Sequence, residues 1–203
     1  MQFNELNQSY KNSIMLWLLA LTVMVFLIII IGGLTRLTDS GLSMVDWRPI
    51  LGTLPPFNNN QWLNVFNDYK LTPEFLYVNK NMTLEEFKYI FWWEWFHRFF
   101  ARLIGLVFII PCFYFLVKKN LNSFFYKRFL IIFSLGLLQA LVGWWMVKSG
   151  LSEDPYVSPY RLTFHLTNAV IIYALLLWTS IEYYHLKSAD FIRFKSKNDL
   201  ILI

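Results

Sequence analysis

The chain has 203 residues, of which 57% are hydrophobic and only 15% are charged, and its formal net charge is +5. This composition excludes an ordinary soluble domain and is typical of an integral membrane protein. We interpret the positive charge as a signal of membrane topology, and we expect no nucleic acid among the partners.

Four apolar segments are each long enough to cross a bilayer, which takes roughly 20 residues of helix. They cover about residues 14–34, 97–117, 129–147 and 162–181, and residues 35–96 form a long connection between the first two. The sequence therefore predicts an all-α fold, an antiparallel four-helix transmembrane bundle with a long helical extracytoplasmic loop. We expect residues 1–203 to form a single membrane domain.

The long connection carries signals of helical structure. Asn59–Tyr69 has apolar side chains at helical spacing, and Thr83-Leu-Glu-Glu86 has the pattern of a capping box. Such a box starts a helix, and the pattern continues without a break into His97.

Basic residues predict the orientation of the bundle. The connection between the second and third spans carries Lys118, Lys119, Lys127 and Arg128, and the tail after the fourth span is also rich in Lys and Arg. The positive-inside rule places both segments, and hence the N-terminus, in the cytoplasm. Because the N-terminus lacks the character of a signal or transit peptide, we expect a multi-pass protein of the bacterial cytoplasmic membrane.

Two of the three histidines, His97 and His165, each open an apolar span. The predicted topology places them at matching depth near the outer face, on parallel helices that can be diagonal partners. Two imidazoles so placed suit axial ligation of haem iron better than a zinc site. The alternative is that each ring hydrogen-bonds within the bundle or reaches the interface. His185, beyond the fourth span, is expected to be exposed.

One acid and several bases accompany the histidines. Glu94 is one helical turn before His97, where it could move protons or stabilise developing positive charge, or simply favour the start of the helix. Basic residues near the outer interface could bind haem propionates, or contact lipid headgroups instead. They are Arg36, Arg98, Arg102, Lys148 and Arg161.

A short motif occurs twice. Ser40-Gly-Leu-Ser43 follows the first span and Ser149-Gly-Leu-Ser152 follows the third, and each precedes a helix that opens on a histidine. The pattern indicates a duplicated two-helix unit. Gln139 and Asn168 are polar residues within spans, and we expect them to hydrogen-bond between helices.

At these residues the chain resembles the haem A synthase family, in its proteobacterial and mitochondrial branch. The resemblance covers about residues 14–182. Its stretches are Gly32–Ser43, Trp47-Arg-Pro49 with Pro55-Pro56, Glu86–Arg98, Gly143–Leu151 and Ser158–His165.

The resemblance implies an oxidoreductase that converts the C8 methyl of haem O to a formyl group, giving haem A for cytochrome c oxidase. It also implies that His97 and His165 are the metal-binding and catalytic pair of the substrate-haem half, with Glu94 as their acidic catalytic partner. The implied partners are haem O, membrane lipid, haem O synthase and cytochrome oxidase assembly factors.

Members of the family have eight spans in two similar halves, and the second half binds a haem b. This chain reaches Ile203 after four spans. We therefore expect the amino-terminal half only, as a fragment or as part of a split enzyme that needs a separate second-half polypeptide or a homo-oligomer. The alternatives are a four-helix bis-histidine b-type cytochrome and an assembly module without oxidative chemistry.

Overall fold

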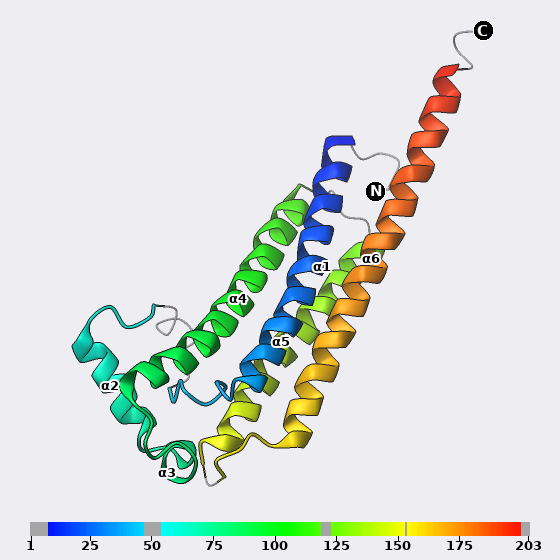
Figure 1. The fold of residues 1–203 in the computed structure, drawn as a ribbon. Helices are drawn as coiled ribbons and strands as arrows, with labels where there is room; N and C mark the ends of the chain where they lie inside the picture. Colours follow the sequence, from blue (N-terminus) through cyan, green and yellow to red (C-terminus); the bar gives the residue numbers. More distant parts are fainter. Residues whose placement is uncertain (1–7, 47–53, 119–122, 153, 200–203) are drawn as a thin grey trace.

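The computed structural model describes residues 8–46, 54–118, 123–152 and 154–199. Within these ranges the chain is helical and contains no strand. The helices are α1 (Gln8–Leu37), α2 (Asn59–Tyr69), α3 (Pro73–Tyr77), α4 (Leu84–Val117), α5 (Ser123–Gly150) and α6 (Pro159–Asp199) (Figure 1). The Trp47-Arg-Pro49 motif lies outside the described residues.

Four of these helices, α1, α4, α5 and α6, are long and apolar enough to cross a membrane. They form an elongated bundle in which α1 packs along both α4 and α6, and α6 also packs along α5 (Figure 1). The predicted all-α, multi-pass fold is confirmed. Because α4 and α6 both pack against α1, the two helices that carry His97 and His165 share a neighbour.

The helices extend beyond the apolar segments from which they were predicted. The fourth predicted span covers about residues 162–181, whereas α6 begins at Pro159 and ends at Asp199. Hydropathy marks only the part of a helix that suits hydrocarbon, whereas the backbone hydrogen bonds that define the helix continue into water.

Aliphatic and aromatic side chains together form the core of the bundle. The indole of Trp17 on α1 lies 5.1–6.0 Å from the rings of Phe108, Phe115 and Phe129, and its Nε1 donates a 2.7 Å hydrogen bond to the carbonyl of Val107. Trp17 therefore ties α1 to both α4 and α5.

Helices α2 and α3 cover one end of the bundle, which we call the loop end; the connection from α5 to α6 lies at the same end (Figure 1). The cover is held by a second apolar cluster in which α2 packs on the first turns of α4. Its buried members are Trp62, Phe66, Tyr69, Phe87, Ile90 and Phe91.

The predicted start of α4 is confirmed. Thr83 accepts a hydrogen bond from the backbone of Glu86, and the Glu86 carboxylate accepts one from the backbone of Thr83 at 2.7 Å. This capping box satisfies backbone donors that a helix N-terminus leaves open. A single continuous helix therefore connects the loop end to His97.

Candidate functional site

His97 lies on α4 directly against α1. A Cβ placed on Gly32 of α1 would lie 3.2 Å from Nε2 of the His97 ring, closer than nearly all real Cβ contacts. The absence of a side chain at Gly32 is therefore what allows the imidazole to lie there.

His165 repeats this arrangement on the other pair of helices. A Cβ placed on Gly143 of α5 would lie only 2.9 Å from Cε1 of the His165 ring on α6. In each two-helix unit, a histidine of the second helix thus lies against a glycine of the first. The repeated motifs also meet, because a Cβ on Gly150 would lie 2.7 Å from the side chain of Leu42. These contacts support the duplicated two-helix unit inferred from the sequence.

Gln139 and Asn168 hydrogen-bond between helices α5 and α6, as expected, and Gln139 contacts His165. The Gln139 amide nitrogen lies 3.2 Å from Nε2 of His165 and 3.1 Å from the His165 carbonyl oxygen. Asn168 donates to the Gln139 amide oxygen at 2.7 Å and to the carbonyl of Leu135 at 3.1 Å. The Nδ1 atom of His165 is buried and has no hydrogen-bond partner. Such an atom is costly to bury.

The two imidazoles lie near enough to interact electrostatically. Among the residues that the structure describes, no three His, Cys, Asp or Glu side chains converge as a metal site. The two rings therefore have no further protein ligand of these types, which suits a metal whose other ligands come from a macrocycle. His185 is exposed, as predicted.

Glu94 is buried and both of its carboxylate oxygens are engaged. One oxygen accepts hydrogen bonds from the Ser43 hydroxyl at 2.6 Å and from the Met44 backbone N–H at 2.8 Å. The other pairs with Arg98, one turn further along α4, and Arg98 also donates to the Met44 carbonyl at 3.2 Å. Glu94 and Arg98 thus fasten the segment after α1 onto α4, immediately beside His97.

The chain reaches this position through a tight turn. Asp39, after the end of α1, has a φ of 46°, in the left-handed region that non-glycine residues seldom adopt. The turn brings the buried Ser40 and Ser43 under the bundle. Sequence reasoning noted this motif as a repeat but missed that Ser43 and the Met44 backbone bind Glu94, because nothing in the pattern relates positions about fifty residues apart.

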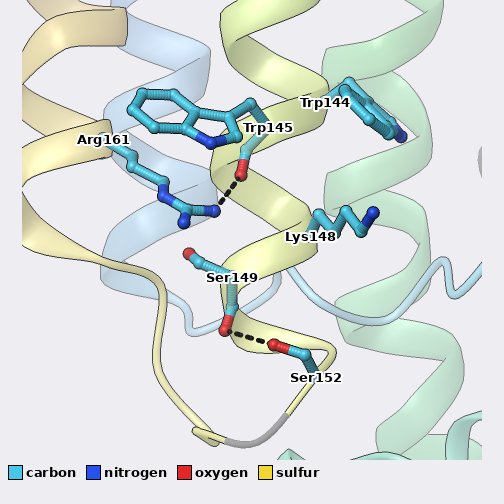
Figure 2. Close-up of a pocket in the computed structure, with 6 residues that line it drawn as sticks. All are labelled: Trp144, Trp145, Lys148, Ser149, Ser152 and Arg161. Carbon is cyan, nitrogen blue, oxygen red and sulfur yellow. Dashed lines mark hydrogen bonds between the residues drawn. The ribbon is translucent and has the colours of Figure 1, made fainter.

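Two of the predicted basic residues line a pocket at the loop end. The pocket has a volume of about 330 Å³ and is lined by Trp144, Trp145, Lys148, Ser149, Ser152 and Arg161. Figure 2 shows Arg161 of α6 beside Trp145, with its guanidinium 4.4 Å from the ring and donating a 2.8 Å hydrogen bond to the Trp145 carbonyl. On the other side of α5, the Lys148 amine lies 5.2 Å from the Trp144 ring.

The pocket presents two cations beside aromatic rings and hydroxyl groups. Such a surface suits a carboxylate or phosphate attached to an apolar body. Arg161 is four residues before His165, so its position on α6 is one turn nearer the loop end than the histidine.

The remaining predicted bases lie elsewhere. Arg102 is one turn beyond Arg98 on α4, and the charges of the two guanidinium groups interact. Arg36 instead forms a 2.8 Å ion pair with Asp39 in which both side chains are largely exposed. The structure therefore does not gather the five predicted bases into one cluster.

A second buried acid, Glu74 of α3, was not anticipated from the sequence. Tyr69 donates a 2.9 Å hydrogen bond to its carboxylate, and Asn79 donates to the Tyr69 hydroxyl at 2.9 Å. Burial raises the pKa of Glu74 to about 7, the charge of Glu94 also raises it, and the Tyr69 hydrogen bond lowers it. Burial likewise raises the pKa of Tyr69. Only the placement of α3 under the bundle makes this acid unusual, so no sequence signal could have found it.

The fold and the site together define a multi-pass helical membrane protein with a histidine pair set against glycines. A family model described as cytochrome oxidase assembly protein matches residues 15–201. The chain therefore belongs to this family, that of the haem A synthases.

Three relatives among the curated proteins carry the name haem A synthase. That of Nitrosomonas eutropha is 52% identical over 167 residues, which is 82% of this chain and 47% of the relative. That of Nitrosospira multiformis is 50% identical over 85% of this chain and 48% of the relative, and that of Parvibaculum lavamentivorans is 43% identical over 91% and 54%.

The chain thus spans about half the length of the curated relatives that it matches. No solved structure matches it.

Proposed function

We propose that the chain is the substrate-haem half of a haem A synthase, which oxidises the C8 methyl of haem O to a formyl group. The observation that carries this proposal is the pair His97 and His165, each set against a glycine whose Cβ would lie 3.2 Å and 2.9 Å from the respective ring. Family membership supplies the reaction. The product, haem A, would go to cytochrome c oxidase.

The residues present fit a haem. The two imidazole rings lie within range of an electrostatic interaction, and no three His, Cys, Asp or Glu side chains converge elsewhere among the described residues. His97 and His165 would hold the iron of haem O, which is the substrate. Arg161 and Lys148, at the loop end of the same bundle, would bind its propionates, and Arg98 and Arg102 are the further candidates.

The reaction requires electrons and protons to leave the site. Conversion of a methyl to a formyl group is a four-electron oxidation, so an electron acceptor outside this chain would have to take the electrons. Glu94 lies one turn from His97, and its negative charge would stabilise positive charge that develops at the methyl carbon. Ser43, Met44 and Arg98 hold the carboxylate in place for this role.

The second half would complete the enzyme. We propose that a separate polypeptide or a further copy of the chain supplies the haem b site, and that haem O synthase and cytochrome oxidase assembly factors are neighbours. The location would be the bacterial cytoplasmic membrane. The basic segment around Lys127 and Arg128 would face the cytoplasm, and the loop end would face outward.

The experiment that tests the proposal is haem analysis of cells that co-produce this chain with a complementary second half. His97→Ala and His165→Ala should each abolish haem A and leave haem O to accumulate. His185→Ala is the matched control, because His185 is exposed near the opposite end of α6, and it should leave haem A unchanged. Normal haem A in either of the first two variants would contradict the proposal.

A haem-binding module without oxidative chemistry is the second candidate. It is favoured by the full engagement of Glu94 by Ser43, Met44 and Arg98, which a purely structural acid would also show. Haem analysis of the wild-type chain with its second half separates the two functions, because a module without oxidative chemistry forms no haem A. In an active chain, loss of haem A with haem still bound in Glu94→Gln assigns Glu94 to the chemistry, whereas unchanged haem A assigns it a structural role.

A further inference from the structure

The amide of Gln139 has only one orientation that its neighbours accept. It lies 3.1 Å from the backbone carbonyl oxygen of His165, which can only accept a hydrogen bond. The atom facing that carbonyl must therefore be the amide nitrogen. The two N–H groups of this nitrogen then point to the His165 carbonyl and to Nε2 of the His165 ring, which is 3.2 Å away.

Asn168 fixes the same orientation from the other side. Its amide nitrogen faces the carbonyl of Leu135 at 3.1 Å, which again can only accept. The second N–H of Asn168 is directed at the Gln139 amide oxygen, 2.7 Å away. We call the hydrogen bonds from Asn168 to Gln139 and from Gln139 to His165 the relay. The backbone carbonyls of Leu135 and His165, on two different helices, determine the direction of every hydrogen bond in it.

The relay determines which ring nitrogen of His165 carries the proton. Because Gln139 donates to Nε2, Nε2 must hold a lone pair, and in a neutral imidazole the proton is then on Nδ1. The relay thus determines the tautomer of His165. In this tautomer Nε2 is the nitrogen able to ligate a metal.

The other half of the duplicated unit has no such relay. Gln139 is four residues before Gly143, and the corresponding residue before Gly32 is Ile28. Asn168 is three residues after His165, and the corresponding residue after His97 is Phe100. Neither Ile28 nor Phe100 has a side-chain amide, so only His165 of the two histidines has the amide pair beside it.

We propose that Gln139, oriented by Asn168, is a positioning residue that holds His165 in the Nδ1–H tautomer and so reserves its Nε2 lone pair for haem iron. This inference rests on the proposed function for the identity of the ligand. The relay itself is a property of the haem-free chain. Nε2 would be the nitrogen that holds the iron, and Gln139 would then keep its hydrogen bond to the His165 carbonyl.

The direct test is the tautomer of His165 in the haem-free chain. The full chain, labelled with ¹⁵N-histidine in detergent micelles, is examined by long-range ¹H–¹⁵N NMR at alkaline pH, where the imidazoles are neutral. The His165 signals are assigned by their loss in His165→Ala. We expect the Nδ1–H pattern in the wild type and the Nε2–H pattern in Gln139→Glu, because a carboxylate accepts where the amide donates.

His97 is the internal control in the same spectra. Its signals should be unchanged in Gln139→Glu, which shows that the bundle is folded. Gln139→Met, of similar shape but without a donor, should give a mixture of tautomers at His165. An Nε2–H pattern in the wild type, or a Gln139→Glu variant that keeps the wild-type tautomer, would overturn the inference.

Haemin titration provides the second readout. In Gln139→Glu the ring proton would be on Nε2 and would have to leave before iron could bind there, so we expect haemin affinity to fall in Gln139→Glu and to fall less in Gln139→Met. Equal haemin affinity in the wild type and both variants would refute the relay and leave the proposed function standing. A wild-type chain that binds no haemin would instead contradict the proposed function.

Discussion

The imidazole of His165 lies directly on Gly143, with Cε1 only 2.9 Å from where a Cβ would stand, and the imidazole of His97 repeats this relationship with Gly32 at 3.2 Å. Both contacts join an apolar helix to the helix that follows it in the same two-helix unit. Each glycine therefore sets the position of one histidine.

Gly143→Ala should displace the His165 ring, because the methyl group would overlap Cε1. Overpacking of this kind costs about 1–3 kcal/mol, and we expect haemin affinity to fall about tenfold, which corresponds to ~1.4 kcal/mol. The measurement is haemin titration of the purified chain, followed by its absorption spectrum. Gly136→Ala on the same helix is the control, because a Cβ there has no neighbour within 4 Å. Equal haemin affinities in the two variants would show that Gly143 does not set the position of the His165 ring.

Removal of Arg98 should be strongly destabilising. Arg98→Ala leaves the carboxylate of Glu94 buried without its cation, and breaking a buried ion pair in this way costs about 3–5 kcal/mol. Thermal or denaturant unfolding in detergent measures the change in free energy of unfolding.

The control for Arg98 is Lys88→Ala, also on α4. Lys88 forms a 2.7 Å ion pair with Glu85, whose side chain is 80% exposed, so loss of this pair should cost about 0–1 kcal/mol, beside the contact of the Lys88 amine with the Trp62 ring at 5.7 Å. If Arg98→Ala lowered the free energy of unfolding no more than Lys88→Ala does, the Glu94–Arg98 pair would not be a stabilising buried ion pair.

The stability of the cover over the loop end should depend on the ionisation of Glu74. Burial raises its pKa from 4.5 to about 7, so the folded chain holds a proton that the unfolded chain releases between these values. Stability is therefore greatest below the unfolded pKa, falls as pH rises towards about 7, and levels off above it. The size of the pKa shift limits this loss of stability to about 3 kcal/mol.

Glu74→Gln should remove this decline, because an amide cannot ionise and still accepts the hydrogen bond from Tyr69. The measurement is the pH dependence of hydrogen exchange in α2 and α3. A variant with the same dependence as the wild type would show that another group is responsible.

Arg161 should contribute to haem affinity through a propionate. Arg161→Ala should weaken haemin binding on the order of tenfold, since hydrogen bonds to charged groups are worth roughly 1.5–3 kcal/mol. The binding of haemin dimethyl ester, in which both carboxylates are blocked, should be almost unaffected. The comparison is made by titration of each porphyrin against both proteins. The same loss with haemin and with the diester would show that Arg161 supports the pocket and does not bind a propionate.

Much of the fold could be predicted because its signals are local. The run of apolar residues specifies each long helix, the spacing in Asn59–Tyr69 specifies α2, and Thr83 with Glu86 specifies the start of α4. The histidines could also be identified in advance, because a polar ring at the start of an apolar span costs free energy and is therefore usually functional.

The arrangement around these residues could not be predicted. Glu94 is bound by the backbone of Met44, and a backbone N–H carries no signal in the sequence. Gln139 and Asn168 were expected to bond between helices, but the direction of their hydrogen bonds depends on carbonyl groups that only the packed helices bring close. Arg36 likewise pairs locally with Asp39, a contact that the sequence alone does not predict.

The most direct test of the central claim, that His97 and His165 bind one haem between them, is the spectrum of the haemin-loaded chain. Two axial imidazoles give a low-spin ferric haem. We expect this spectrum in the wild type and in His185→Ala, and a high-spin spectrum or loss of haem in His97→Ala and in His165→Ala. A low-spin spectrum that persists at full occupancy in either of these two variants would contradict the claim.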